Sequence, residues 1–276
     1  MNWKKALYES TSLIVTLPFT RIQNLLQTQK VHADLEHEVQ HKGLFEYIKK
    51  MGKDEHYDQS YRGGTAKLAS ILLSASLPTA MKVIKSKLID EGWNFVLVNA
   101  ILGTSALALI YPFNVAYVKM TLDLGKVREI RSLKEFFVSR YKDRGFRSFF
   151  KGFGWLFLNI VVYRLTVRTL YQWAPVDLHQ DKSWGVAVKK LAFGLIGSLV
   201  AYPLETIRKR IIATEDHPVT SHRDMNNVRF FSGLFDGYDF VVYQTLLNGL
   251  FGVLYEGFVG ILLNKFLPSG EEVVVE

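Results

Sequence analysis

Three prolines divide the chain at nearly equal intervals, at positions Pro18, Pro112 and Pro203. Their separations are 112 − 18 = 94 and 203 − 112 = 91 residues. Each proline follows an apolar run and precedes a basic stretch, so the spacing marks the repetition of a whole structural unit. We therefore expect one domain built from three tandem repeats, at about 1–90, 91–183 and 184–276.

Long apolar runs predict that each repeat contributes two membrane helices. No charged residue occurs from Trp93 to Val118, which is long enough to cross a hydrocarbon layer of ~30 Å as a helix. A second uncharged run extends from Phe240 to Tyr255, and only Glu256 interrupts its continuation. Weaker or shorter runs cover 6–26, 65–89, 152–163 and 191–204. A soluble bundle of six buried helices is the alternative, but uncharged runs of this length are rare in soluble folds. The sequence therefore predicts an all-α membrane protein.

Composition excludes several classes of function. The net charge of +8 suits an anionic partner, either lipid headgroups or an anionic solute. Lys and Arg are spread between the helices and form no compact patch, which argues against nucleic acid. The absence of Cys excludes disulfides, and no nucleophile–base pair, phosphate loop or paired carboxylate stands out, so we expect no enzyme activity. His32, His37 and His41 lack a further spaced ligand, so we expect no metal site there.

Two short segments and two glycines complete the helical pattern. The segments 43–51 and 132–141 place apolar residues on one face of a short helix at the membrane surface. Gly103 and Gly197 lie in spans where small residues permit close helix packing, although either could be an ordinary tolerated glycine. The first ten residues show neither a secretory signal nor an Arg-rich leader.

The residues around each proline resemble a known signature, Pro-x-[Asp/Glu]-x-x-[Lys/Arg]-x-[Lys/Arg]. Repeat 3 matches it in full, whereas repeats 1 and 2 keep the proline and lose charges: Pro203, Glu205, Arg208 and Arg210; Pro112, Asn114, Tyr117 and Lys119; Pro18, Thr20 and Gln23. An aromatic residue, a charged residue and glycine follow in each repeat, at 61–63, 150–152 and 235–237. On these residues the chain resembles the mitochondrial carrier family, and within it the ADP/ATP carriers. The resemblance implies six membrane helices around a pseudo-threefold axis in the mitochondrial inner membrane.

The resemblance also implies a gate formed by paired residues near the three prolines: Thr20, Gln23, Asn114, Tyr117, Glu205 and Arg208. Glu205 should meet Gln23, and Arg208 should meet Asn114. Thr20 should meet Tyr117. We expect neutral hydrogen bonds in place of the family's ion pairs, each with about half the strength of the charged pair that it replaces. At the opposite gate only Glu256 keeps a charge, beside Val83/Ser86, Gln172/Pro175 and Val259.

The positions that hold three nucleotide-binding cations in the ADP/ATP carriers are occupied here by Leu13, Ser70 and Gln244. Removing three charge-assisted hydrogen bonds costs ~4–9 kcal/mol, or roughly 10³ to 10⁶ in affinity. Nucleotide is therefore an unfavourable substrate. The candidate cavity residues are Ser70, Asn159, Ile160, Tyr163, Arg164 and Gln244. Arg164 could contact an anion or be satisfied by an internal partner.

The same resemblance implies bound cardiolipin where the even-numbered helices begin, because helix N-termini favour anions. The candidates are Arg62, Gly63, Lys151 and Gly152, whereas Asp236 should repel phosphate at the third site. No other cofactor is expected.

Two roles remain open for such a chain. One is an accessory subunit of a larger inner-membrane complex, inactive as a nucleotide exchanger, with the polar 215–229 segment as part of the contact surface. The other is a carrier of an unidentified small metabolite, or one with residual adenine nucleotide transport.

Overall fold

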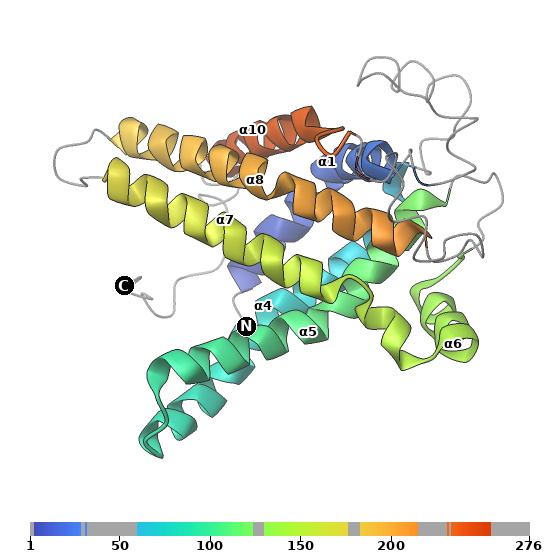
Figure 1. The fold of residues 1–276 in the computed structure, drawn as a ribbon, viewed down its shortest axis with the longest axis horizontal. Coiled ribbons are helices and arrows are strands. Elements are labelled where there is room, and N and C mark those ends of the chain that lie inside the picture. Colours follow the sequence, from blue (N-terminus) through green and yellow to red (C-terminus); the bar gives the residue numbers. More distant parts are fainter. Residues whose placement is uncertain are drawn as a thin grey trace, which may run out of the picture.

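The computed structural model describes residues 3–28, 31, 60–123, 130–175, 183–214, 231 and 233–254. In these ranges the regular structure is helical, with six long helices and two short ones between α5 and α7 (Figure 1). The long helices are α1 (Trp3–Thr28), α4 (Gly64–Asp90), α5 (Phe95–Leu122), α7 (Phe153–Trp173), α8 (Ser183–Ala213) and α10 (Tyr238–Leu254); the short ones are α6 (Leu133–Arg144) and η2 (Phe146–Phe150).

One pattern of elements occurs three times along the chain. A long helix contains a proline, and a later helix begins directly after a glycine in the left-handed region. The prolines lie inside α1, α5 and α8. Gly63, Gly152 and Gly237 precede α4, α7 and α10 with φ values of 83°, 81° and 79°.

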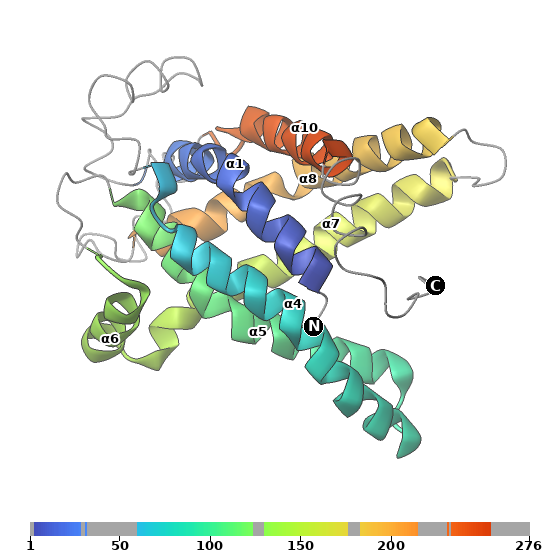
Figure 2. The ribbon, with the colours of Figure 1, turned by 180° about the vertical axis from the view of Figure 1, so that it is seen from behind.

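The long helices form a ring that closes at one end. α1 packs against α4 and α10, α4 against α5, α7 against α8, and α8 against α10, while α5 reaches α7 through η2. The helices that contain the three repeat prolines, α1, α5 and α8, also contact one another. Both views show the hairpins α4–α5 and α7–α8 diverging away from this contact (Figures 1 and 2). We call the C-terminal ends of α1, α5 and α8, together with the residues around them, the closed end.

Three of the described helices are long and apolar enough to cross a membrane: α4, α5 and residues 185–213 of α8. Over the residues described, α1, α7 and α10 do not meet both conditions. The all-helical membrane architecture is thus confirmed, and the six expected spans correspond in position to six long helices.

The main apolar core lies at the closed end and joins all three repeats. It includes Leu25 of α1, Val115 of α5, Ile212 of α8 and Phe240 of α10, each at most 2% exposed. α6 contributes Phe136, which packs edge-on against Phe137 and is buried. The short helix expected at 132–141 is therefore present as α6, whereas the 43–51 segment lies outside the described residues.

The three helix-starting glycines make equivalent contacts around the ring. A methyl group added to Gly63 would meet the carbonyl oxygen of Tyr117 in α5, 3.1 Å away. At Gly152 it would meet the Arg208 carbonyl of α8 at 3.6 Å, and at Gly237 the Gln23 carbonyl of α1 at 3.6 Å. Gln23, Tyr117 and Arg208 each lie five residues after a repeat proline. Each of the helices α4, α7 and α10 therefore begins against the helix that contains the repeat proline of the next repeat, with repeat 1 following repeat 3 around the ring.

We expect Gly197→Ala to destabilise the fold by about 1–3 kcal/mol, because the added methyl would lie 2.6 Å from Val167 and 3.1 Å from the Tyr163 ring. Gly103→Ala is the matched control, since nothing lies within 4 Å of its added methyl. That change should be neutral or stabilising by up to about 1 kcal/mol, because alanine favours helix. Thermal unfolding in detergent measures both, and equal shifts would contradict close packing at Gly197.

Candidate functional site

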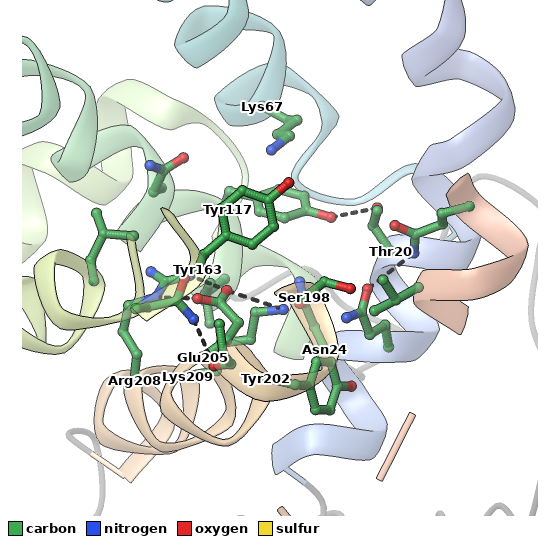
Figure 3. A pocket seen from close by; sticks show the side chains of 18 residues that line it. Thr20, Asn24, Lys67, Tyr117, Tyr163, Ser198, Tyr202, Glu205, Arg208 and Lys209 are labelled. Atoms are coloured by element: carbon green, nitrogen blue, oxygen red, sulfur yellow. Dashed lines mark hydrogen bonds and ion pairs between the residues drawn. The ribbon is translucent and has the colours of Figure 1, made fainter. Parts of the chain in front are cut away.

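A cavity of about 380 Å³ lies between the six long helices near the closed end (Figure 3). Each long helix contributes to its lining: Thr20 from α1, Lys67 from α4, Asn114 from α5, Asn159 from α7, Ser198 from α8 and Val241 from α10. The cavity therefore lies on the axis around which the repeats are arranged.

All six expected gate residues line this cavity, together with three of the cavity candidates, Asn159, Tyr163 and Gln244. Ser70, Ile160 and Arg164 are not among the lining residues. Ser70 is buried and donates to the Lys67 carbonyl along its own helix, 2.9 Å away. Arg164 is exposed. The structure therefore does not place these three residues in the cavity wall, although Ser70 and Ile160 lie about one helical turn from residues that line it.

Two neutral hydrogen bonds connect helices across the gate. The Tyr117 hydroxyl donates to Thr20 Oγ1 at 2.6 Å, which is the contact expected between these positions. Gln23 does not meet Glu205 as expected, because its Oε1 accepts from Gln244 Nε2 at 3.1 Å. Gln23 is thus hydrogen-bonded to α10 and not to Glu205.

The charged gate residues pair with one another along α8 rather than with residues of other helices. Arg208 donates through Nε and Nη2 to the Glu205 carboxylate, at 2.9 and 2.5 Å. Lys209 Nζ lies 3.5 Å from the same carboxylate and donates to Gln27 Oε1 at 2.7 Å. The structure shows no hydrogen bond between Arg208 and Asn114, because Glu205, three residues away on the same helix face, holds Nε and Nη2 of the guanidinium.

Three buried cations close the end of the ring by binding backbone carbonyls. Arg21 Nε of α1 donates to the Thr121 carbonyl of α5 at 3.3 Å. Lys119 of α5 donates to Ala213 of α8 at 3.2 Å, and Arg210 of α8 donates to Gln27 of α1 at 2.7 Å. These carbonyls belong to the last turns of the three helices, which lack intrahelical partners and carry the negative end of the helix dipole.

Arg21, Lys119 and Arg210 link α1 to α5, α5 to α8 and α8 back to α1. We call these three contacts the cation–carbonyl ring. All three side chains are at most 7% exposed. A signal for it is present in the sequence, since Lys119 and Arg210 both lie seven residues after a repeat proline. The ring joins α1, α5 and α8 through backbone oxygens, without a carboxylate at any of these three contacts.

Lys67 is a cavity cation that the sequence interpretation missed. Its ammonium points at the Tyr117 ring, 5.4 Å from the centroid (Figure 3). Between Gly64 and Met81 it is the one charged residue, and a single charge within a membrane span normally faces a protein interior or a wet cavity. That isolation was the signal available in the sequence.

Known proteins of similar sequence include several ADP/ATP carriers. No protein-family profile matches the chain. The chain is 26% identical over 215 residues to ADP/ATP translocase 2 of Bos taurus and to ADP/ATP translocase 3 of Homo sapiens, and each alignment covers 71% of both chains. It is 24% identical over 234 residues to a probable ADP,ATP carrier protein of Arabidopsis thaliana, covering 74% of this chain and 70% of the relative. The chain is therefore similar to ADP/ATP carriers over about seven tenths of its length. These relatives are transport proteins and not enzymes.

The contacts of Arg62 at the start of α4 differ from those expected. Arg62, a candidate for contact with lipid, is buried and donates to the carbonyl and the carboxylate of Asp123, at 2.5 and 3.2 Å. Its side chain therefore couples the start of α4 to the end of α5 and is not available to a headgroup. Lys151, beside Gly152, keeps an exposed side chain while its carbonyl accepts from Tyr111 at 2.5 Å.

None of the three altered positions carries a cation, and each side chain there is buried or already hydrogen-bonded. Leu13 is 9% exposed and Ser70 is 5% exposed. Gln244 is engaged with Gln23. Among the cavity candidates in α7, Asn159 donates to the Ala201 carbonyl of α8 at 2.9 Å, so its amide ties α7 to α8. The Glu256 gate position lies outside the described residues.

Proposed function

We propose that the protein is a carrier-fold component of the mitochondrial inner membrane that does not exchange adenine nucleotides. The observation that carries this proposal is the state of the three altered positions, where two side chains are buried and the third is hydrogen-bonded. Binding of a nucleoside triphosphate needs several charge-assisted hydrogen bonds to its phosphates, and the loss of each one weakens binding by about 1.5–3 kcal/mol.

We further propose that its role is that of an accessory subunit of a larger membrane complex. An exchanger must separate α1, α5 and α8 in every cycle. Here that step would pull Arg21 and Arg210, both 0% exposed, away from their carbonyl acceptors. Unpaired buried cations are costly, which favours a protein that keeps one conformation. The 215–229 segment, proposed as part of the contact surface, lies outside the described residues.

Two measurements on the natively purified protein test this function. In mild detergent it should migrate within a large complex rather than as a free species of 31.6 kDa. Reconstituted alone in liposomes, it should exchange no ADP for ATP above empty vesicles, while bovine ADP/ATP translocase 2 serves as the positive control. Exchange comparable to that control would refute the first proposal, and migration as a free monomer would refute the second.

Bound cardiolipin remains a proposal for the start of α7. Gly152 begins that helix, and the exposed Lys151 lies beside it, so a headgroup phosphate would meet both free backbone N–H groups and an ammonium. Burial of Arg62 removes the corresponding cation from the start of α4. We therefore propose that the α7 site is the stronger of the two.

A second candidate function, transport of a small solute, is favoured by one observation. The cavity is lined by three cations, Lys67, Arg208 and Lys209, and by one carboxylate, Glu205. An accessory subunit has no evident need for such an imbalance of charge within a membrane.

A further inference from the structure

We propose that the cavity at the closed end binds a small oxyanion, such as inorganic phosphate or a short carboxylate, through Lys67, Asn114 and Arg208. These residues come from α4, α5 and α8, one from each repeat, and all line the same cavity. The proposal goes beyond the accessory role and does not depend on it, because a retained subunit and a small-solute carrier would both present this site.

The first argument is the balance of charge around the cavity. Glu205 is the one carboxylate among the lining residues, and it already pairs with both Arg208 and Lys209. Three cations against one carboxylate leave two positive charges without a counter-charge in the cavity wall. Charges within membrane spans are normally paired, because an uncompensated charge away from bulk water is expensive. An anion of one or two charges would supply the missing balance.

The second argument is the state of Lys67. Among the residues that the structure describes, its ammonium has a ring contact with Tyr117 and no hydrogen-bond or ion-pair partner. An ammonium group has three donors, and a ring face satisfies none of them as a hydrogen-bond acceptor would. Lys67 therefore offers donors to a ligand in the cavity.

The third argument comes from Arg208 and Asn114. The guanidinium uses Nε and Nη2 for Glu205, but Nη1 is buried without a hydrogen-bond partner in the structure. Arg208 as a whole is 6% exposed, so bulk water cannot readily satisfy that nitrogen. Asn114 also lines the cavity, and its amide has no hydrogen-bond partner within the described part of the chain. A buried guanidinium nitrogen without a partner is uncommon in native proteins and calls for an explanation.

The volume and the donors together select the size of the anion. At about 380 Å³ the cavity is near the lower limit for small-molecule sites. Its three available donor groups suit one phosphate or carboxylate group rather than a chain of phosphates. Tyr117 and Thr20 already bond to each other, so they add no free donor beside Lys67.

Titration of inorganic phosphate into the purified full-length protein, in mild detergent at constant ionic strength, tests the site. Calorimetry should show saturable binding to the wild type. Lys67→Gln should weaken it by about tenfold or more, since one charge-assisted hydrogen bond is removed, whereas Lys67→Arg should retain it. Lys82→Gln is the matched control, because Lys82 is exposed on the same helix and does not line the cavity.

A second variant and two other ligands test the same site independently. Asn114→Leu removes a donor with little change of size, and it should also weaken binding if Lys67→Gln does not fold. Acetate in place of phosphate distinguishes a carboxylate site from a phosphate site, and ATP should bind no more tightly than phosphate. Absence of saturable binding by both small anions, or equal affinity in the wild type, Lys67→Gln and Asn114→Leu, would overturn the oxyanion site and leave the accessory role untouched. Tight ATP binding would instead count against the proposed function.

Discussion

Replacing Asp123 by asparagine is expected to lower the free energy of unfolding by about 3–5 kcal/mol, the usual result of removing one partner from a buried ion pair. The side chains of Arg62 and Asp123 are each 5% exposed, and their charged atoms lie 3.2 Å apart. Asparagine keeps the shape but removes the carboxylate charge that faces the buried guanidinium. Thermal or denaturant unfolding in detergent, followed by helical circular dichroism, measures the change.

Two further variants identify the cause of this destabilisation. Asp143→Asn removes a carboxylate that bonds to Ser139 on the exposed surface of α6, and it should change stability by no more than about 0.5 kcal/mol. The double variant Arg62→Met with Asp123→Leu removes both charges and should recover much of the stability. If Asp123→Asn is as mild as Asp143→Asn, the pair does not hold α4 against α5.

Gly63→Ala is expected to be at least as damaging as any ordinary core substitution, because two costs act at one position. Its φ of 83° lies in the left-handed region, where a side chain costs about 1–2 kcal/mol. The added methyl would also lie 3.1 Å from the Tyr117 carbonyl, a backbone atom that cannot rotate away. Crowding of that kind adds about 1–3 kcal/mol.

Gly92 separates the two costs, because it has a φ of 87° and nothing within 4 Å of an added methyl. Gly92→Ala should therefore show the backbone cost alone. Unfolding of the two variants under the same conditions gives the difference directly. Similar destabilisation at both positions would mean that the approach of α4 to α5 at Gly63 is looser than the structure indicates.

Periodicity predicted the fold well, because helix positions depend on patterns that span many residues. The uncharged run from Trp93 corresponds to α5, and the apolar run at 65–89 corresponds to α4 almost residue for residue. The run at 191–204 is much shorter than α8, which continues to Ala213. That continuation carries Arg208, Lys209 and Arg210, which are buried at the closed end. From hydropathy alone, these three charges would mark the end of a membrane span.

Individual partners were harder to predict, because a single sequence does not fix side-chain direction across a helix interface. Tyr117 and Thr20 meet as the family resemblance implied. Arg62, by contrast, had the sequence context of a surface cation and is buried against Asp123, 61 positions away. Gln23 was assigned to α8 and bonds to α10, since an amide can reach either neighbour and the helix spacing decides between them.

The cation–carbonyl ring also affects which mutations this protein can tolerate. A salt bridge depends on two charged side chains, so substitution of either residue abolishes it. In the ring, each acceptor is a peptide carbonyl at Gln27, Thr121 or Ala213, and no substitution at those positions removes that oxygen while the helix ends there. Only the three donor side chains can be lost by substitution. Three salt bridges would instead depend on six side chains, so the ring halves the number of positions at which a mutation can open the closed end. A carrier could therefore shed the charged pairs of its gate one by one and still keep its three repeats joined.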